Sequence, residues 1–355
     1  MTNHELAALL PPVPHDAHKY TRGSLLVLAG SLRFPGAAVL AAQAATRTGA
    51  GYVTLAIPGP AAAAAHAHLL SVPVLAAPAT EGAFAAEAWG HVRAQAGHID
   101  ALVLGPGLTV TASTEAFVRS VLHDAAGAPL LLDADALTVL ASLMQKEPAF
   151  AVGAPSLLLT PHAGELRRLL GSDGAAGGGA DDSAGSQGSA PANPLTCGPT
   201  DRAADGRTDD PAAARTDGPA AAQRPAVTLA QALVAWGAPG APAPFEAVVV
   251  AKGPTTHIAS ATSATSAGTA PHGLQSRSLS PGTPALAKAG TGDVLSGVIG
   301  SLLAQGIAPF DAAVLGVSLH GRAGRLAEQS LGQRGTCAED LPACLPLALK
   351  EIEGR

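Results

Sequence analysis

The 355-residue sequence predicts a single α/β domain with a three-layer α/β/α architecture and a mostly parallel central sheet. From Gly23 onward, apolar runs typical of buried strands alternate with longer helical runs. Hydrophobic residues make up 47% of the chain, many of them Ala, while aromatic residues make up only 3%. This composition favours close packing of helices on a sheet over a core of large rings.

The first β-α-β unit is predicted at 24–58. Residues 24–31, SLLVLAGS, predict a buried strand that ends in a turn of small residues. Residues 35–50 predict an Ala-rich helix that Pro35 begins and Gly49 ends. Residues 52–58, YVTLAIP, predict the next strand, so the crossover between the two strands should be right-handed.

The same alternation continues through the rest of the chain. Strands followed by polar or glycine-rich turns are predicted within 101–107, 129–137, 156–166 and 247–256, and a long helical region follows Gly292. Open α/β sheets bind ligands at the carboxyl ends of their strands. The polar residues at these strand ends are therefore candidates for one shared site.

Two low-complexity stretches interrupt the pattern. Residues 172–225 are almost wholly Gly, Ala, Ser, Pro, Asp, Thr and Arg, which bury too little apolar surface to offset the entropy of ordering. They predict a disordered insertion in a domain whose core spans about 18–330. The shorter tract at 260–282 predicts an extended hairpin or a crossover loop.

Charge and targeting signals exclude several classes of function. The formal net charge of −6 provides no basic surface for a nucleic-acid backbone. Cys197, Cys337 and Cys344 match neither a zinc site nor a disulfide framework, so the sequence predicts a reducing compartment. The chain has no recognisable signal peptide and no apolar run of membrane-spanning length, which favours the cytoplasm.

The most specific motif is AGTGDVLSGVIGSLLAQG at 289–306, in which a glycine-rich turn opens a helix. Small residues let backbone N–H groups approach a phosphate, and the helix dipole favours negative charge there. Asp293, in the first helical turn, could act as a general base toward a substrate hydroxyl. The alternative is that Asp293 only caps the helix.

Three further strand ends carry candidate ligand contacts. AVVVAKGPTTHIA at 247–259 could bring Lys252 to a phosphate, although a solvated lysine on a β-hairpin is the alternative. TPHAGEL at 160–166 puts His162 at a helix start, where it is either a substrate contact or part of a capped junction. DADAL at 133–137 has two aspartates that could hold a hydroxyl or hydrated magnesium, or could begin a helix.

Two motifs are predicted to be structural. HKYTRG at 18–23 precedes the first strand, and a solvated entry loop is favoured there over a ligand contact. LHGRAG at 319–324 favours close packing of helices through small residues.

Taken in order, HKYTRG, LAGS with PGAA, GPGL, DADAL, TPHAGEL, AKGPTT and AGTGDVLSG resemble the NAD(P)H-hydrate dehydratase family of the ribokinase-like superfamily. The resemblance covers nearly all of 18–325 except the low-complexity insertion. It implies ADP-dependent removal of water from the S epimer of hydrated NADH or NADPH, with ATP as the alternative phosphoryl donor. Asp293 would assist phosphoryl transfer to the substrate hydroxyl, and Mg²⁺ would bridge the phosphates, with ligands that the sequence does not identify.

The resemblance also assigns binding residues. For the nucleotide these are Lys252, Gly253, Pro254, Thr255 and Thr256 in one segment, and Gly290, Thr291 and Gly292 in another. For the hydrated cofactor they are Ala37 or Ala38, Gly107, His162 and Asp293.

Family members are often fused to an epimerase domain, for which the few residues before HKYTRG leave no room, so a separate epimerase is the expected functional partner. The family also implies a homo-oligomer, expected to be a tetramer. Two alternatives stay open: a ribokinase-like kinase for a vitamin-precursor alcohol, and a nucleotide-binding regulatory module without turnover.

Overall fold

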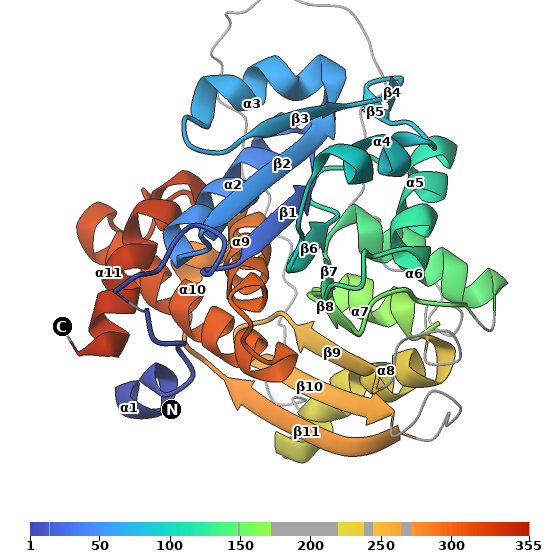
Figure 1. The fold of residues 1–355 in the computed structure, drawn as a ribbon. Helices are drawn as coiled ribbons and strands as arrows, with labels where there is room; N and C mark the ends of the chain where they lie inside the picture. The colour runs from blue at the N-terminus through green and yellow to red at the C-terminus, as the bar shows by residue number, and fades with distance from the viewer. Residues whose placement is uncertain (14, 148–149, 172–218, 238–243, 264–270, 355) are drawn as a thin grey trace, which may run out of the picture.

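A computed structural model describes residues 1–13, 15–147, 150–171, 219–237, 244–263 and 271–354. Helices and strands alternate along most of this chain (Figure 1). Their bounds are α1 (Asn3–Ala7), β1 (Ser24–Leu28), α2 (Pro35–Thr48), β2 (Tyr52–Pro58), α3 (Ala62–His68), β3 (Val74–Ala77), β4 (Ala79–Thr80), β5 (Ala83–Phe84), α4 (Ala88–Gln95), β6 (Ala101–Leu104), α5 (Ala112–His123), β7 (Leu130–Leu132), α6 (Asp135–Lys146), β8 (Ser156–Leu159), α7 (Ala163–Leu169), α8 (Pro219–Gly237), β9 (Glu246–Ala251), β10 (Thr256–Ser263), β11 (Pro271–Leu279), α9 (Thr291–Ala304), α10 (Pro309–Leu331) and α11 (Leu341–Glu353).

A nine-stranded sheet in the order β11-β10-β9-β8-β7-β6-β1-β2-β3 runs through the molecule. Neighbouring strands are parallel throughout the part of the sheet that runs from β9 to β3, whereas β10 is antiparallel to both β9 and β11. The predicted mostly parallel sheet is therefore confirmed. The hairpin alternative is also confirmed for the described part of 260–282, because β10 and β11 pair there; residues 264–270 lie outside the described chain.

The first β-α-β unit follows the sequence prediction closely. Pro35 occupies the first turn of α2, and Gly49 ends the helix with a φ of 111°, a left-handed conformation that glycine adopts without steric cost. β1 and β2 pair in parallel from Ser24 opposite Tyr52 to Leu28 opposite Ala56.

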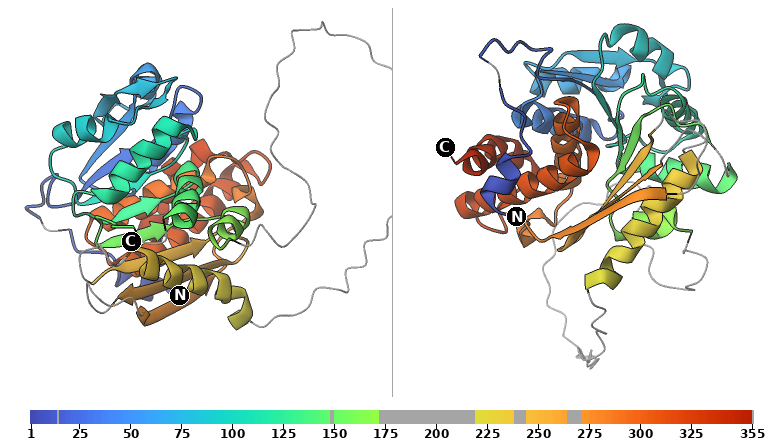
Figure 2. Two further views of the ribbon diagram at one scale, coloured as in Figure 1. Left: turned by 90° about the vertical axis from the view of Figure 1, so that its right-hand side faces the viewer. Right: turned by 60° about the horizontal axis from the view of Figure 1, so that its bottom comes forward.

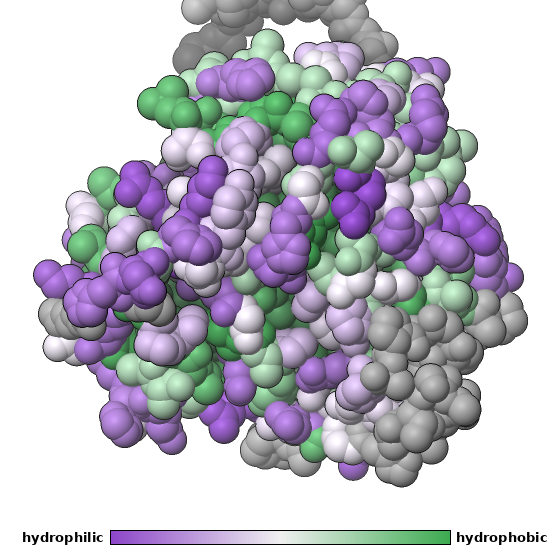
Figure 3. All heavy atoms as spheres, viewed as in Figure 1, coloured by the Kyte–Doolittle hydropathy of each residue, from purple (hydrophilic) through white to green (hydrophobic). Residues whose placement is uncertain are grey.

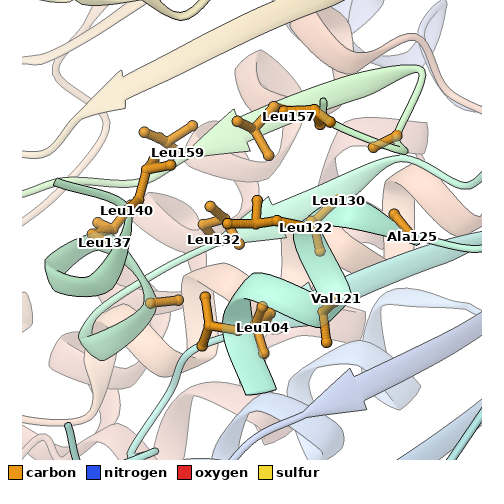
Figure 4. Close-up of a cluster of buried hydrophobic side chains, with 14 of the residues drawn as sticks. Leu104, Val121, Leu122, Ala125, Leu130, Leu132, Leu137, Leu140, Leu157 and Leu159 are labelled. Carbon is orange, nitrogen blue, oxygen red and sulfur yellow. The ribbon is translucent and has the colours of Figure 1, made fainter. Parts of the chain in front are cut away.

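Helices cover both faces of the sheet, as Figure 2 shows from two sides. Alternate residues of the same strand point to opposite faces: Leu158 of β8 packs toward α9 and α10, while Leu157 and Leu159 pack toward α5, α6 and α8. Figure 4 shows leucines of β6, β7 and β8 meeting those of α5 and α6. Burying each such leucine stabilises the fold by about 1.5–3 kcal/mol, so this packing holds the strand ends in fixed positions.

Two predicted boundaries are wrong. α8 begins at Pro219, so residues 219–225 of the predicted insertion are helical, and Gln223 of this segment donates a hydrogen bond of 2.7 Å to Ser278 on β11. The rest of that insertion, 172–218, lies outside the described residues. The core also extends beyond 18–330, because Leu6 on α1 and Leu341 and Leu345 on α11 are buried.

The surface seen in Figure 3 is mainly hydrophilic, with scattered hydrophobic residues. Of the helices in the described chain, none combines the length and the apolar character needed to cross a membrane. Cys337 and Cys344 are free thiols, and Cys197 lies outside the described residues.

Candidate active site

The predicted polar strand ends meet at one edge of the sheet. β7 leads into Asp133 and β9 leads into Lys252, and the Lys252 ammonium lies 2.9 Å from a carboxylate oxygen of Asp133. The other Asp133 oxygen accepts a hydrogen bond of 2.6 Å from the Ser296 hydroxyl on α9. Three elements thus converge on Asp133, whose residue exposure is only 1%.

Lys252 remains a cation at this half-buried position. Burial disfavours its charged form, but the Asp133 and Glu165 carboxylates outweigh that effect and raise the pKa of Lys252 above its usual value. A methyl group added to Gly292 would lie 3.4 Å from Lys252 Nζ, so the ammonium faces the start of α9. An ammonium has three N–H donors, so Lys252 retains donors for a phosphate besides the bond to Asp133.

Asp293 lies in the first turn of α9, beside this ion pair. Burial raises the pKa of Asp293 to about 7; the negative charge of Asp133, and more weakly that of Asp135, adds to the rise, and Lys252 opposes it. A general base works best when its pKa is near the working pH, because it is then both available and basic. The surroundings of Asp293 therefore suit proton transfer at neutral pH.

The turn before α9 leaves the first backbone N–H groups of the helix without a side-chain acceptor. Gly290 is the N-cap with a φ of 88°, and no side chain caps the helix. The Thr291 hydroxyl donates back to the carbonyls of Leu286 and Lys288, at 2.8 and 2.9 Å, which holds the turn in place. Since the first N–H groups of a helix have no intrahelical acceptor, this start is suited to an anion.

His320 on α10 supports the same turn. Its Nε2 donates a hydrogen bond of 2.9 Å to the Thr291 carbonyl. Burial lowers the pKa of His320 to about 4, so the ring is neutral at physiological pH. The prediction that 319–324 only packs helices missed this contact, since local pattern does not reveal a bond between residues 29 positions apart. Ser296 was missed too, although it stands one helical turn after Gly292 within the predicted motif.

The loops that follow β6 and β7 each contain a residue with a strained backbone. Thr109 and Ala134 have positive φ values of 65° and 50°, a backbone conformation that residues other than glycine rarely adopt. The Thr109 N–H donates to Asp135 at 2.9 Å, and burial is the main cause that raises the pKa of Asp135. Such strain persists only where surrounding structure enforces it and often marks functional sites.

Of the predicted substrate contacts, the structure brings Gly107 and Ala37 together. A methyl group at Gly107 would lie 2.9 Å from the Ala37 side chain, and Gly107 has a φ of 66°. Ala38 was the alternative to Ala37, and with 0% exposure it packs in the core. Ala37 is therefore the residue of this pair that borders Gly107, and the substrate contact stays a prediction.

His162 is the N-cap of α7. Its Nδ1 accepts hydrogen bonds of 3.0 and 3.4 Å from the N–H groups of Gly164 and Glu165, and the Glu165 carboxylate accepts one from the His162 N–H. The capped junction considered from sequence is thus present. The Nε2 atom lies 3.5 Å from a Glu165 carboxylate oxygen, and 61% of the His162 side chain is exposed to solvent.

The turn after β9 is mixed in character. Gly253, Pro254 and Thr255 are exposed, and the Thr255 hydroxyl hydrogen-bonds Ser280 at 2.9 Å. Thr256 is buried, and its hydroxyl donates to the Gly253 carbonyl at 3.3 Å. Thr256 therefore stabilises the turn, while the other three residues are open to a ligand.

For magnesium, the described residues contain no group of three or more His, Cys, Asp or Glu side chains placed to hold a metal ion. Both oxygens of Asp133 already accept hydrogen bonds. Magnesium bound to nucleotide phosphates needs only one or two protein carboxylates, with water filling the remaining positions. The residues present suit magnesium that arrives with a nucleotide, with Asp135 and Asp293 as the nearby carboxylates.

The nine-stranded sheet with helices on both faces gives the chain a ribokinase-like α/β fold. The model of the NAD(P)H-hydrate dehydratase family matches residues 25–190 and 241–346, and the chain belongs to this family. The resemblance stated from the sequence motifs is confirmed.

Individual relatives agree. The chain is 30% identical to the ADP-dependent (S)-NAD(P)H-hydrate dehydratase of Xanthomonas campestris, covering 96% of this chain and 92% of that protein. It is 32% identical to the bifunctional NAD(P)H-hydrate repair enzyme of Salinibacter ruber, covering 99% of this chain but 53% of that protein, so it spans about half the length of such relatives. A crystal structure of the ADP/ATP-dependent NAD(P)H-hydrate dehydratase of Bacillus subtilis, co-crystallised with ATP and Mg²⁺, superposes with a TM-score of 0.63 at 25% identity, covering 99% and 97% of the two chains.

Proposed function

We propose that this protein repairs hydrated NADH and NADPH by ADP-dependent dehydration of the S epimer, releasing AMP and phosphate. The observation that carries the proposal is the position of Asp293, a carboxylate with a pKa of about 7 beside the Lys252–Asp133 ion pair. Family membership supplies the substrate class.

The chemistry follows from the residues at this edge of the sheet. The ADP β-phosphate would lie against the N–H groups at the start of α9 and the Lys252 ammonium, which offset its charge. Asp293 would accept the proton of the substrate hydroxyl while the hydroxyl oxygen attacks the β-phosphorus and AMP leaves. The C–O bond of the new ester then breaks, phosphate departs, and loss of a ring proton restores the double bond.

Substrate contacts are proposed for Ala37, Gly107 and His162, and nucleotide contacts for Lys252 to Thr255 and Gly290 to Gly292. Asp135 and Asp293 would hold magnesium when it is bound, and the metal would supply positive charge that offsets the charge of the phosphates. The choice of ADP over ATP, the tetramer and the separate epimerase stay predictions.

The test is recovery of absorbance at the reduced-nicotinamide band when purified protein is mixed with hydrated NADH, magnesium and ADP or ATP. Asp293→Asn should remove turnover. The matched control is Asp311→Asn, because Asp311 lies in the first turn of α10 rather than α9 and should be dispensable. A stable phosphate ester in place of NADH would instead identify a small-molecule kinase.

A further inference from the structure

A cavity of about 280 Å³ lies between α10, α1 and the segment that follows β11. Ser318, Arg322 and Arg325 line one side of it; they are spaced i, i+4 and i+7 and so share one face of α10. Leu6, Ser280 and Pro281 line the other side. Figure 1 shows α1 close to α10 and to the carboxyl end of β11.

The charge in this cavity is unbalanced. Among the residues that line it within the described chain, two are arginines and none is a carboxylate. Arg322 donates a hydrogen bond of 2.7 Å to Asn3, whose side-chain oxygen is uncharged. Burial, together with the positive charge of Arg325, lowers the pKa of Arg322, although Glu351 acts in the opposite direction.

Arg325 is only partly exposed, and its guanidinium makes no hydrogen bond or ion pair with any residue that the structure describes. The positive charges of Arg322 and Arg325 act on each other across one face of α10, so the pair of arginines favours an anion between them. Arginine is also the side chain best matched to phosphate, because its planar N–H groups bond two oxygens at once.

The size of the cavity restricts the anion. Sites for whole organic ligands usually have volumes of about 300–1,000 Å³, so this cavity lies at the lower limit and suits a phosphate group rather than an entire nucleotide. Ser280 adds a hydroxyl at the cavity wall, whereas the Ser318 hydroxyl is already committed to the Val314 carbonyl at 2.8 Å.

We propose that Arg322, Arg325 and Ser280 form a second anion site, which binds phosphate outside the candidate active site. The two sites are connected, because Ser280 also hydrogen-bonds Thr255 in the turn proposed to hold the nucleotide. The phosphate can be free inorganic phosphate or the terminal group of a larger molecule. Recognition depends on the two guanidinium groups in either case and does not require the proposed catalytic function.

The test is equilibrium dialysis of the full chain against radiolabelled inorganic phosphate, at constant ionic strength, with and without saturating ADP. ADP fills the nucleotide site, so binding that survives ADP reports the second site. We expect one phosphate per chain in the presence of ADP, and about tenfold or greater weakening in Arg325→Gln, since a hydrogen bond to a charged group contributes about 1.5–3 kcal/mol. Arg93→Gln on α4 is the matched control and should bind as the wild type does.

Phosphate binding that ADP abolishes, or that Arg325→Gln leaves unchanged, would overturn the second site. Circular dichroism of each variant without phosphate establishes that it is folded, and Arg322→Gln replaces Arg325→Gln if that variant unfolds. A second dialysis with unlabelled ADP-ribose 2′-phosphate as competitor separates the sources. If ADP-ribose 2′-phosphate displaces the radiolabelled phosphate at a lower concentration than unlabelled phosphate does, the ligand is a phosphate group on a larger molecule. If unlabelled phosphate displaces it at the lower concentration, the ligand is the free ion. The assay for recovery of NADH remains independent of these results.

Discussion

Two helices begin at the same edge of the sheet, and they begin differently. At α7, His162 and Glu165 close a capping box, so the helix satisfies its own first N–H groups. At α9, the cap is Gly290, whose φ of 88° and lack of a side chain leave the first turn open beside Lys252.

This contrast determines which helix start can hold a phosphate. Backbone N–H groups already bonded to a side chain are unavailable to a ligand, whereas open ones beside a half-buried cation attract an anion. The α7 start is therefore a capped structural junction, and the α9 start is the one suited to an anion.

Removing the cation next to α9 should have the largest effect. Lys252→Ala leaves Asp133 charged and buried without its partner, which should lower the free energy of unfolding by about 3–5 kcal/mol. Urea unfolding measures the loss. A Lys252→Ala, Asp133→Ala double variant should recover part of the stability, and a double variant that is less stable than Lys252→Ala would argue against the ion pair.

Adding a methyl group should separate the two helix starts. Gly290→Ala places a side chain at positive φ and within 2.9 Å of Ala338 and Leu40, so we expect a loss of about 2 kcal/mol and weaker ADP binding. Gly164→Ala in α7 places a methyl group 3.0 Å from the His162 ring, whose side chain is 61% exposed and can move aside. Stability should therefore change by less than about 1 kcal/mol, with ADP affinity unchanged. Calorimetric titration with ADP compares them, and equal losses of affinity would remove the distinction.

The stability of the protein should also depend on Asp293. Its folded pKa of about 7 exceeds that of an unfolded aspartate, so the folded chain holds an extra proton between about pH 4 and 7. The protonated Asp293 therefore contributes to the free energy of unfolding at low pH, and this contribution is lost as the pH rises to 7. Asp293→Asn should be more stable than wild type by about 4 kcal/mol above pH 7 and should match it near pH 4. A constant difference between the two across this range would exclude the raised pKa.

The smallest effect is expected at α7. His162→Ala removes the cap and should cost about 1 kcal/mol, while His162→Asn keeps an acceptor and should restore most of it. If His162 also contacts substrate, both variants raise KM for hydrated NADH; if it only caps the helix, neither does. Thermal unfolding and steady-state kinetics distinguish these outcomes.

Local patterns predicted the parts of the fold that local forces determine. Pro35 and Gly49 mark the ends of α2, and apolar runs mark the parallel strands. The start of α8 was missed because Pro219 and its neighbours lack an apolar stripe, and the helix depends on packing against β9 and β10. The site was predicted in the same way, because a strand end identified Lys252 and the glycine-rich turn before a helix identified Asp293. The pairing of Lys252 with Asp133, 119 residues earlier, comes only from the sheet order.

A crystal structure of the protein with ADP and magnesium would show whether the start of α9 holds the nucleotide, because it locates the β-phosphate. We expect the β-phosphate within hydrogen-bonding distance of the Gly292 and Asp293 N–H groups and of Lys252 Nζ, with the Asp293 carboxylate facing the open side of the phosphorus. A β-phosphate bound at the start of α7, or away from both helix starts, would contradict the account.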